Sequence, residues 1–502
     1  MTLLDTLAPL RSFGKARTNG LTDDVILDFA SRHPQLGEVI EAAAVEFERV
    51  RAEFPELLAL DEDAQTIAIQ AGFVNFYSHD AANPYVALVA RGPWIVTLKG
   101  AVVYDTGGYG MLGLGHTPEA VIAAMTTPQA MANIMTPNVS QLRFTNAMRA
   151  EIGQTRSSVT GDGCPYSAFM CLNSGSESVS LAARIIDANA KTMTDPGARH
   201  AGKTIKRVVV KGSFHGRTEK PALYSDSSRK SYMANLASYR DESSVITVPP
   251  YEVDALRKVF ADADANGWFI EAMFLEPVMG EGDPGRSVPV PFYELARELT
   301  RGHGSLLLVD SIQAGLRATG YLSVVDYPGF DKSDAPDMET YSKALNAGQY
   351  PLSVLAVTES TAAIYKRGLY GNTMTANPRA LDVACAVLGQ LTPALRANIQ
   401  QRGKQALAML EALKAESEGR ITKVQGTGLL FSCELAAGYK GYGTGSTEEW
   451  MRERGIGVIH GGENSLRFTP QFAVTEDELA LVVSAIKRAL LEGPRQQQAA
   501  AA

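Results

Sequence analysis

Lys343 and Asp310 are the two residues whose types and setting point most directly to chemistry. Asp310 ends the apolar run 306–309, which is typical of a buried strand, and Lys343 follows in a loop of small residues. A lysine amine can form a Schiff base with an aldehyde, and a buried carboxylate can keep a pyridine nitrogen protonated so that the ring withdraws electrons. The pair therefore predicts a site for pyridoxal phosphate.

A first supporting segment is a glycine-containing turn before a helix-like stretch. After the apolar run 169–172, Gly175 and Ser176 precede this stretch. The first amide groups of a helix bind anions, and glycine lets a phosphate approach the backbone closely. The ordinary alternative is a capping box between Ser174 and Glu177, which is far commoner than a phosphate site.

Two more apolar runs lead into candidate site residues. After residues 208–210, Phe214 could stack on a planar ring, with His215 beside it. A buried phenylalanine and a hydrogen-bonded histidine in a turn is the ordinary alternative. After residues 273–275, Glu276 should project toward the same ligand, unless it simply pairs with a nearby basic residue.

Gln313 and Arg467 complete the set of candidate residues. Gln313 lies three residues after Asp310 and would contact the ring hydroxyl of the cofactor. Arg467 lies in an alternating strand segment, and an arginine is suited to a bidentate grip on a substrate carboxylate. The ordinary alternatives are a helix cap for Asp310 and a solvated arginine at a strand edge for Arg467.

The segments that must position these residues have the pattern of an α/β fold. Between about residues 165 and 360, short apolar runs alternate with helix-like segments, which indicates βαβ units and a mostly parallel sheet. Ligands of open α/β sheets bind beyond the carboxyl ends of the strands, so the candidate loops should share one site. Residues 1–85 look helical, and short strands follow from Val86.

Composition limits the classes of partner. The chain has 502 residues, enough for two or three domains, and its net charge of -8 without a basic run argues against nucleic-acid binding. No apolar stretch reaches the ~18 residues needed to cross a bilayer, and residues 1–5 do not look like a signal peptide. The four cysteines lack metal-ligand spacing. We therefore expect a cytoplasmic protein with no resident metal, no membrane and no nucleic-acid partner.

The order of these motifs resembles the class III aminotransferases, a family with the type I pyridoxal-phosphate fold. The resemblance extends from about Val86 to the final helix. Five segments carry it: the phosphate turn at 173–177, the aromatic-His-Gly-Arg-Thr motif at 214–218, the Glu-Pro-x-x-Gly-Glu-Gly motif at 276–282, the lysine motif at 342–345, and the segment 372–378, whose threonine, here Thr373, reaches the cofactor phosphate of a partner subunit.

The resemblance implies a division into domains. A large α/β/α domain with a mostly parallel sheet, residues 146–380, would bind pyridoxal phosphate. A smaller α+β domain would be built from residues 86–145 and 381–492. A helical extension, residues 1–85, and a flexible tail, residues 493–502, would remain.

The resemblance also implies a homodimer or higher homo-oligomer with active sites at the subunit interface. Tyr109 would line the substrate pocket, and Glu276 and Arg467 would be the movable glutamate and the carboxylate-binding arginine of the family. One departure concerns the cofactor ring. The family usually has Asp-Glu-Val-Gln where this chain has Asp-Ser-Ile-Gln at 310–313, so the contacts beneath the ring should differ.

The activity expected from these residues is that of an aminotransferase. Lys343 would hold the cofactor as a Schiff base and then move a proton as a general base. A ping-pong cycle would carry an amino group from an amino acid or amine to a 2-oxo acid, either 2-oxoglutarate or pyruvate. The alternative is a racemase, epimerase or aminomutase, for which Tyr109 or His215 could supply a second acid or base. The intact Lys343 and Asp310 disfavour a non-catalytic sensing module.

Overall fold

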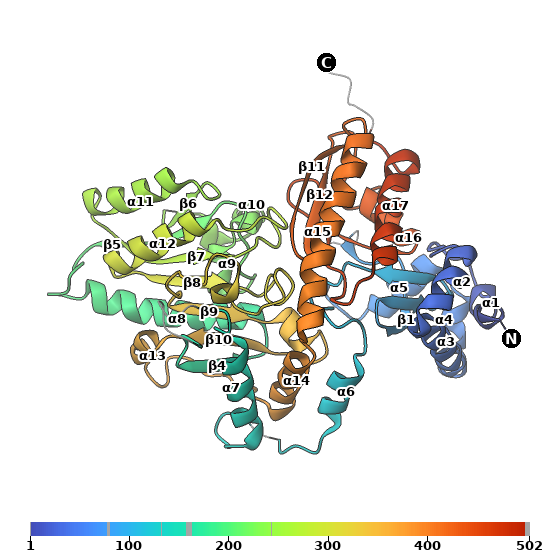
Figure 1. Cartoon of the computed structure of the whole chain (residues 1–502), viewed down its shortest axis with the longest axis horizontal. Coiled ribbons are helices and arrows are strands. Elements are labelled where there is room, and N and C mark those ends of the chain that lie inside the picture. The colour runs from blue at the N-terminus through green and yellow to red at the C-terminus, as the bar shows by residue number, and fades with distance from the viewer. Residues whose placement is uncertain (1, 78–80, 132, 157–162, 242, 497–502) are drawn as a thin grey trace. The chain divides into compact units, whose positions relative to one another are not determined.

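The computed structural model describes residues 2–77, 81–131, 133–156, 163–241 and 243–496 (Figure 1). These residues form two compact units. The first unit consists of Met1–Pro118, Gln401–Gln425 and Phe431–Ala502, and the second of Glu119–Gln400 and Gly426–Leu430. No helix in the described ranges is both long enough and apolar enough to span a bilayer.

The second unit is built on a seven-stranded sheet with the strand order β4-β10-β9-β8-β7-β5-β6. The strands are β4 (Ala168–Leu172), β5 (Thr204–Val210), β6 (Val245–Val248), β7 (Trp268–Leu275), β8 (Leu306–Asp310), β9 (Met338–Tyr341) and β10 (Ser353–Val357). The neighbouring pairs β6–β5, β5–β7, β7–β8 and β8–β9 are parallel. Strand β10 pairs antiparallel with both β9 and β4. Every strand except β10 therefore ends at the same edge, which confirms the expected α/β architecture.

In the chain, the helices of the second unit precede, separate and follow these strands, with α8 to α12 lying between them. They are α6 (Glu119–Thr126), α7 (Val139–Glu151), α8 (Gly175–Thr194), α9 (Glu219–Tyr224), α10 (Arg229–Asn235), α11 (Val253–Ala265), α12 (Val290–His303), α13 (Glu359–Ile364) and α14 (Pro378–Gly389), and α15 (Pro393–Glu416) follows. Apolar residues recur at helical spacing along α8, and Val179, Ala182 and Ile186 are buried in one cluster with sheet residues such as Phe274 and Leu308. This packing fixes the start of α8 beyond the end of β4.

The first unit contains two four-stranded sheets. One has the order β1 (Ala87–Arg91), β2 (Trp94–Thr97), β3 (Val102–Asp105), β13 (Ile456–Gly457), and the other β11 (Ile421–Thr427), β12 (Leu430–Leu435), β15 (Ser465–Phe468), β14 (Ile459–Gly461). Its helices are α1 (Leu3–Leu7), α2 (Asp23–Arg32), α3 (Pro34–Glu53), α4 (Pro55–Ala59), α5 (Glu62–Gln70), α16 (Thr447–Glu453) and α17 (Glu476–Glu492).

The amino-terminal helices belong to the core of the first unit. The apolar side of α3, including Val39, Ile40 and Phe47, is buried, and α3 contacts β1 and β2. Lys99 is 3% exposed, and its ammonium group donates to the backbone carbonyl oxygens of Phe13, Leu58 and Leu60. Because a buried ammonium needs such acceptors, Lys99 fastens the start of the chain to the sheet.

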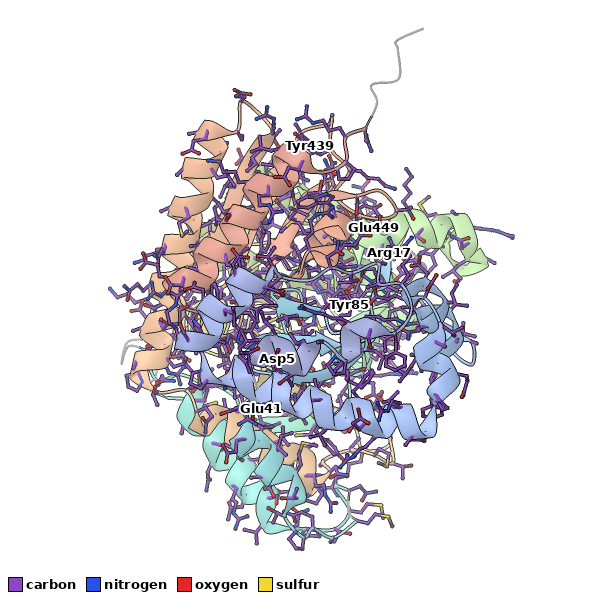
Figure 2. The ribbon with its side chains drawn as sticks, turned by 90° about the vertical axis from the view of Figure 1, so that its right-hand side faces the viewer. Asp5, Arg17, Glu41, Tyr85, Tyr439 and Glu449 are labelled. Atoms are coloured by element: carbon purple, nitrogen blue, oxygen red, sulfur yellow. The ribbon has the colours of Figure 1, made fainter. Side chains whose placement is uncertain are left out.

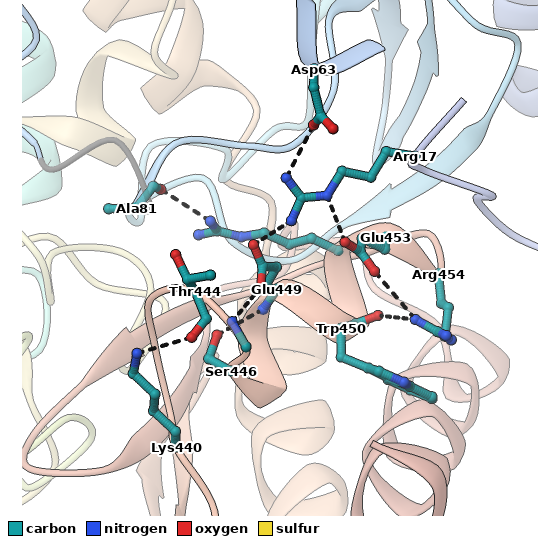
Figure 3. A network of polar contacts seen from close by, with 12 residues as sticks. Arg17, Asp63, Ala81, Lys440, Thr444, Ser446, Glu449, Trp450, Glu453 and Arg454 are labelled. Carbon is teal, nitrogen blue, oxygen red and sulfur yellow. Dashed lines mark hydrogen bonds and ion pairs between the residues drawn. The ribbon is translucent and has the colours of Figure 1, made fainter. Parts of the chain in front are cut away.

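An ion-pair network adds a second attachment of the amino-terminal segment. Figure 2 labels Arg17 and Glu449 close to each other, and Figure 3 shows that Arg17 contacts three carboxylates. Its guanidinium lies 2.8 Å from Glu453 and 3.2 Å from Asp63, and it also pairs with Glu449. Glu449 and Glu453 are one turn apart on α16, so the network joins the segment before α2 to that helix.

Candidate active site

Asp310 lies at the carboxyl end of β8 and is almost completely buried, with 4% of its surface exposed. Its Oδ2 atom is 2.8 Å from Nδ1 of His215, and its Oδ1 atom accepts a hydrogen bond from the backbone N–H of Ile312 at 3.1 Å. His215 is itself buried, and its Nε2 atom has no partner among the described residues. The ring of His215 therefore orients Asp310 through Nδ1.

Lys343 follows β9, the strand that pairs with β8, in a strained loop. Its φ angle is +45°, which is uncommon for a residue with a Cβ atom and persists only when the surroundings impose it. Here Ser342 Oγ and Asn346 Nδ2 both donate to the carbonyl oxygen of Leu352, at 2.7 and 2.8 Å. The ammonium group of Lys343 donates to Oε1 of Gln313, which brings these two candidate residues together.

The start of α8 has the capping box that is the ordinary alternative to a phosphate site. Ser174 Oγ accepts from the backbone N–H of Glu177 at 3.4 Å, and Glu177 Oε2 accepts from the N–H of Ser174 at 3.3 Å. A capped helix start can still bind an anion, because its first N–H groups have no acceptor within the helix. The capping box therefore does not exclude a phosphate site at Gly175 and Ser176.

Two glycines allow three segments to converge at this helix start. A Cβ atom on Gly175 would lie 2.5 Å from Cδ1 of Ile312, two residues after Asp310. Gly216 has a φ angle of +111°, and a Cβ atom there would lie 2.4 Å from Oγ of Ser176. The segments after β4, β5 and β8 therefore approach one another at distances that only glycine permits.

Glu276 lies beyond β7 and is 5% exposed. Its two carboxyl oxygens accept from the backbone N–H groups of Phe214 and Gly280, each at 2.9 Å, and it forms no ion pair with an arginine or lysine in the described ranges. Burial raises the pKa of Glu276 to about 7. Among the described residues, Glu276 therefore does not follow the ordinary alternative of a carboxylate neutralised by a basic neighbour.

Phe214 is half-buried next to Glu276. The guanidinium carbon of Arg217 lies 5.2 Å from the centre of the Phe214 ring, which is a cation–π distance. Phe214 is thus held from one side by Arg217 and through its backbone by Glu276. This arrangement fixes an aromatic ring at the end of β5, beside the strand that leads to Glu276.

Ser311, which replaces the glutamate usual in the family, contacts a carboxylate from the neighbouring strand. Its Oγ atom donates to Oε1 of Glu339 on β9 at 2.5 Å. The sequence analysis did not single out Glu339. The signal that could have found it is an acidic residue inside a short strand, between Met338 and Tyr341, four residues before Lys343.

Thr373 lies on the surface of the second unit. Its carbonyl oxygen accepts from Nδ2 of Asn133 at 3.1 Å, and the preceding residue, Asn372, bonds the carboxylate of Glu177. Thr373 also lines a cavity of about 930 Å³ whose wall includes Phe144. The reach of Thr373 to the cofactor phosphate of a partner subunit remains a prediction.

Tyr109 and Arg467 belong to the first unit, where the structure brings their segments together. Gly110 donates its N–H to Oγ1 of Thr469 at 3.2 Å, and Thr469 donates its own N–H to the carbonyl of Thr106 at 2.8 Å. Tyr109 has a φ angle of +50°, another uncommon value. Arg467 is 4% exposed on β15, between β12 and β14, so it is not a solvated arginine at a strand edge.

The residues of the second unit fit the chemical groups of pyridoxal phosphate. Lys343 offers an amine to the aldehyde, and Asp310 a buried carboxylate to the ring nitrogen. The glycine-bearing start of α8 suits the phosphate. Gln313 is buried, and its Nε2 atom has no partner among the described residues, so it is available to the ring hydroxyl. No cluster of His, Cys, Asp or Glu that could hold a metal occurs in the described part of the chain.

Comparison with known proteins gives one consistent result. The family model for class III aminotransferases matches residues 76–490. The acetylornithine aminotransferase of Xanthomonas campestris pv. campestris is 30% identical over 378 residues, which cover 74% of this chain and 84% of that protein.

Solved structures agree in fold. The ornithine aminotransferase from Toxoplasma gondii, crystallised with partial occupancy of PLP at its active site, has a TM-score of 0.71 at 24% identity, covering 86% of this chain and 94% of its own. The acetylornithine aminotransferase from Elizabethkingia anophelis has a TM-score of 0.66 at 21% identity, and the match covers 86% of this chain and 99% of that protein. At these identities the likeness establishes a shared fold.

Proposed function

The chain belongs to the class III aminotransferases and is a pyridoxal-phosphate-dependent aminotransferase, and we propose that Lys343 is the residue that binds its cofactor. When bound, pyridoxal phosphate supplies an aldehyde that reacts with amines and a ring that withdraws electrons. The observation that carries the proposal is the pairing of β8 with β9, which brings Asp310 and Lys343 to one edge of the sheet, with Lys343 in a strained loop.

Lys343 has two tasks in this proposal. It first holds the cofactor through its amine, and after a substrate amine has replaced it, the freed amine moves the proton from the substrate carbon. Gln313 accepts a hydrogen bond from the Lys343 ammonium group, which keeps the amine near the position from which the proton must be taken.

Asp310 keeps the ring nitrogen protonated. A carboxylate that is only 4% exposed favours a cation beside it, because an unpaired buried charge is costly. His215 fixes the direction of this carboxylate through its 2.8 Å contact. Since its Nδ1 atom is committed to Asp310, we assign His215 to positioning and not to a second acid or base over the ring.

We assign the cofactor phosphate to the start of α8, at Gly175 and Ser176, and the ring face to Phe214. Thr373 would reach the phosphate of a partner subunit. The positive end of the α8 dipole and the outward N–H groups of its first turn support the phosphate assignment.

The substrate-side residues are Tyr109, Glu276 and Arg467. We propose that Arg467 binds the carboxylate of the 2-oxo acid, 2-oxoglutarate or pyruvate, because a guanidinium suits bidentate binding of a carboxylate and the backbone of Arg467 lies in a strand flanked on both sides. A Glu276 carboxyl group with a pKa of about 7 can be charged or neutral near neutral pH, which suits a residue that must adapt to different substrate groups. Ornithine and N-acetylornithine, for which the relatives are named, are the first donors to test.

We propose that the enzyme is a homodimer that uses an apolar face of the second unit. Exposed apolar side chains gather on two segments that Asn133 joins by its bond to Thr373: Met131, Ile134, Met135, Leu369 and Met374. Contiguous exposed apolar surface of this kind marks an interface. Light scattering should give the mass of two chains, and Met135→Glu with Met374→Glu should give one.

The experiment that tests the assignment of Lys343 is its replacement by alanine. Lys343→Ala should retain its fold and bind pyridoxal phosphate without covalent attachment, so that borohydride no longer fixes the cofactor to the chain. Turnover should fall by at least about 10⁴-fold, because both the amine and the base are lost. Lys332→Ala, an exposed lysine of the same unit, is the control. Full activity in Lys343→Ala would overturn the assignment.

A further inference from the structure

Glu339 is a fully buried carboxylate, with 0% of its surface exposed, that receives four hydrogen bonds. Its Oε1 atom accepts from Ser311 Oγ at 2.5 Å and from the backbone N–H of Val324 at 2.8 Å. Its Oε2 atom accepts from the hydroxyl of Tyr166 at 2.7 Å and from Ser323 Oγ. The four donors come from three different segments, because Ser323 and Val324 are adjacent, so one side chain joins these three segments.

The number of donors matches an ionised carboxylate. Two carboxylate oxygens offer about four lone-pair sites, and each is used here. A protonated carboxyl group would have to donate one of these bonds, and one hydroxyl would have to change from donor to acceptor. Burial raises the pKa of Glu339, and the four hydrogen bonds act in the opposite direction.

The position of Glu339 in the sheet connects it to the site. It pairs with Val309, the residue before Asp310, and it lies four residues before Lys343. Side chains alternate between the faces of a strand, so Glu339 points to the face opposite Asp310. On the other face, Thr340 Oγ1 bonds Ser178 of α8, whose first turn is the proposed phosphate site. The end of β9 is thus fastened on both faces.

We propose that Glu339 is a positioning residue that locks the end of β8, which carries Asp310, to the end of β9, which leads to Lys343. The proposal rests on the assignment of Asp310 and Lys343 to the cofactor. Without the Ser311 contact, the ends of β8 and β9 would lose a buried side-chain link between the segments that carry Asp310 and Lys343, and a small shift in a catalytic group has a large effect on rate.

The four donated hydrogen bonds assign Glu339 the ionised form. The titratable groups that face it are the Cys164 thiol and tyrosines from several elements, Tyr166, Tyr293, Tyr327 and Tyr341, and within the described ranges it forms no ion pair. An uncompensated negative charge in the sheet stabilises nearby cations, which here means the protonated forms of the Lys343 amine and of the ring nitrogen. Removal of this charge should therefore change the pH at which the cofactor site loses a proton, which loosened packing alone would not do.

The test uses two variants of the holoenzyme that differ in charge. Glu339→Gln keeps the shape and removes the charge, whereas Ser311→Ala removes only the link to β8. Both should bind pyridoxal phosphate about tenfold more weakly, and both should lower kcat about tenfold with little change in the KM of the donor. In Glu339→Gln alone, the pH midpoint of the visible cofactor band, measured without substrate, should fall by roughly one pH unit.

Two controls make the result decisive. Glu294→Gln, at a carboxylate of α12 that accepts from Ser333 at 2.9 Å, should change neither cofactor affinity nor the midpoint. Thermal unfolding of the cofactor-free variants establishes that they fold, and if Glu339→Gln fails to fold, Ser311→Ala carries the test. Wild-type cofactor affinity and kcat in a folded Glu339→Gln or Ser311→Ala variant would overturn the proposal. Failure of the cofactor assignment itself would instead appear in the wild type, as the absence of a visible band.

Discussion

Among the residues of the site, Glu276 is the carboxyl group whose charge changes near neutral pH. Burial raises its pKa from 4.5 to about 7, so the folded protein binds this proton more tightly than the unfolded chain does. The stabilisation is complete below about pH 4.5 and is lost as the pH rises through 7, and it amounts to roughly 3 kcal/mol. Glu276→Gln should abolish this pH dependence.

The measurement is urea unfolding of the cofactor-free protein at several pH values between 5 and 8. The wild type should lose stability relative to Glu276→Gln as the pH rises. The comparison with Glu281→Gln, a half-exposed neighbour, controls for the general effect of losing a carboxyl group. Parallel stability curves for the wild type and Glu276→Gln would contradict the raised pKa.

We expect His215 to act on the reaction through Asp310, because its Nδ1 atom lies 2.8 Å from that carboxylate. His215→Ala leaves Asp310 without this donor, and a hydrogen bond to a charged group contributes about 1.5–3 kcal/mol. We expect kcat to fall about 10- to 100-fold, and cofactor affinity to fall with it. His200→Ala, at another buried histidine of the same unit, should lower stability and leave the cofactor spectrum unchanged. Equal spectra for the His215→Ala variant and the wild type would contradict this role.

At the scale of elements, the site depends on the approach of the loop after β5 to the start of α8. Gly216→Ala tests this approach, because the new Cβ atom would meet Ser176 Oγ and the φ angle of +111° is strained for alanine. We expect a loss of roughly 1–3 kcal/mol in stability and weaker binding of pyridoxal phosphate. Equilibrium dialysis with the cofactor measures the second effect. Gly302→Ala, on α12 in open space, is the control, and equal affinity in both variants would contradict the proposed phosphate site.

The sequence predicted where the apolar strands of the second unit end more reliably than it predicted which buried side chains contact one another across neighbouring strands. The uninterrupted apolar run 306–309 identified β8, because a strand buried on both faces excludes polar residues. β9 was missed, because Glu339 and Thr340 interrupt its apolar character and their buried partners lie far away in the chain. The burial of Arg467 was equally hidden, since alternation along β15 does not reveal that strands flank it on both sides.

At the scale of the whole molecule, the amino-terminal segment is a structural part of the first unit. Its helices bury Leu7, Ile26 and Phe47, and Lys99 binds three of its carbonyl oxygens. Lys99→Ala should lower the free energy of unfolding by roughly 3 kcal/mol, because buried acceptors lose a charged donor. Removal of residues 1–70 should leave the first unit unfolded, which limited proteolysis would detect. A truncated protein with wild-type protease resistance would show that the segment is a dispensable arm.

The most direct test of the central claim is the visible spectrum of the purified enzyme during one half of the reaction. With ornithine, N-acetylornithine or L-glutamate present and no 2-oxo acid, the yellow cofactor band should disappear as the amino group moves to the cofactor. Addition of 2-oxoglutarate or pyruvate should restore it, and neither change should occur in Lys343→Ala at a comparable rate. A band that stays yellow with every donor, while the α-hydrogen of the substrate exchanges with deuterated solvent, would contradict amino-group transfer and indicate an isomerase.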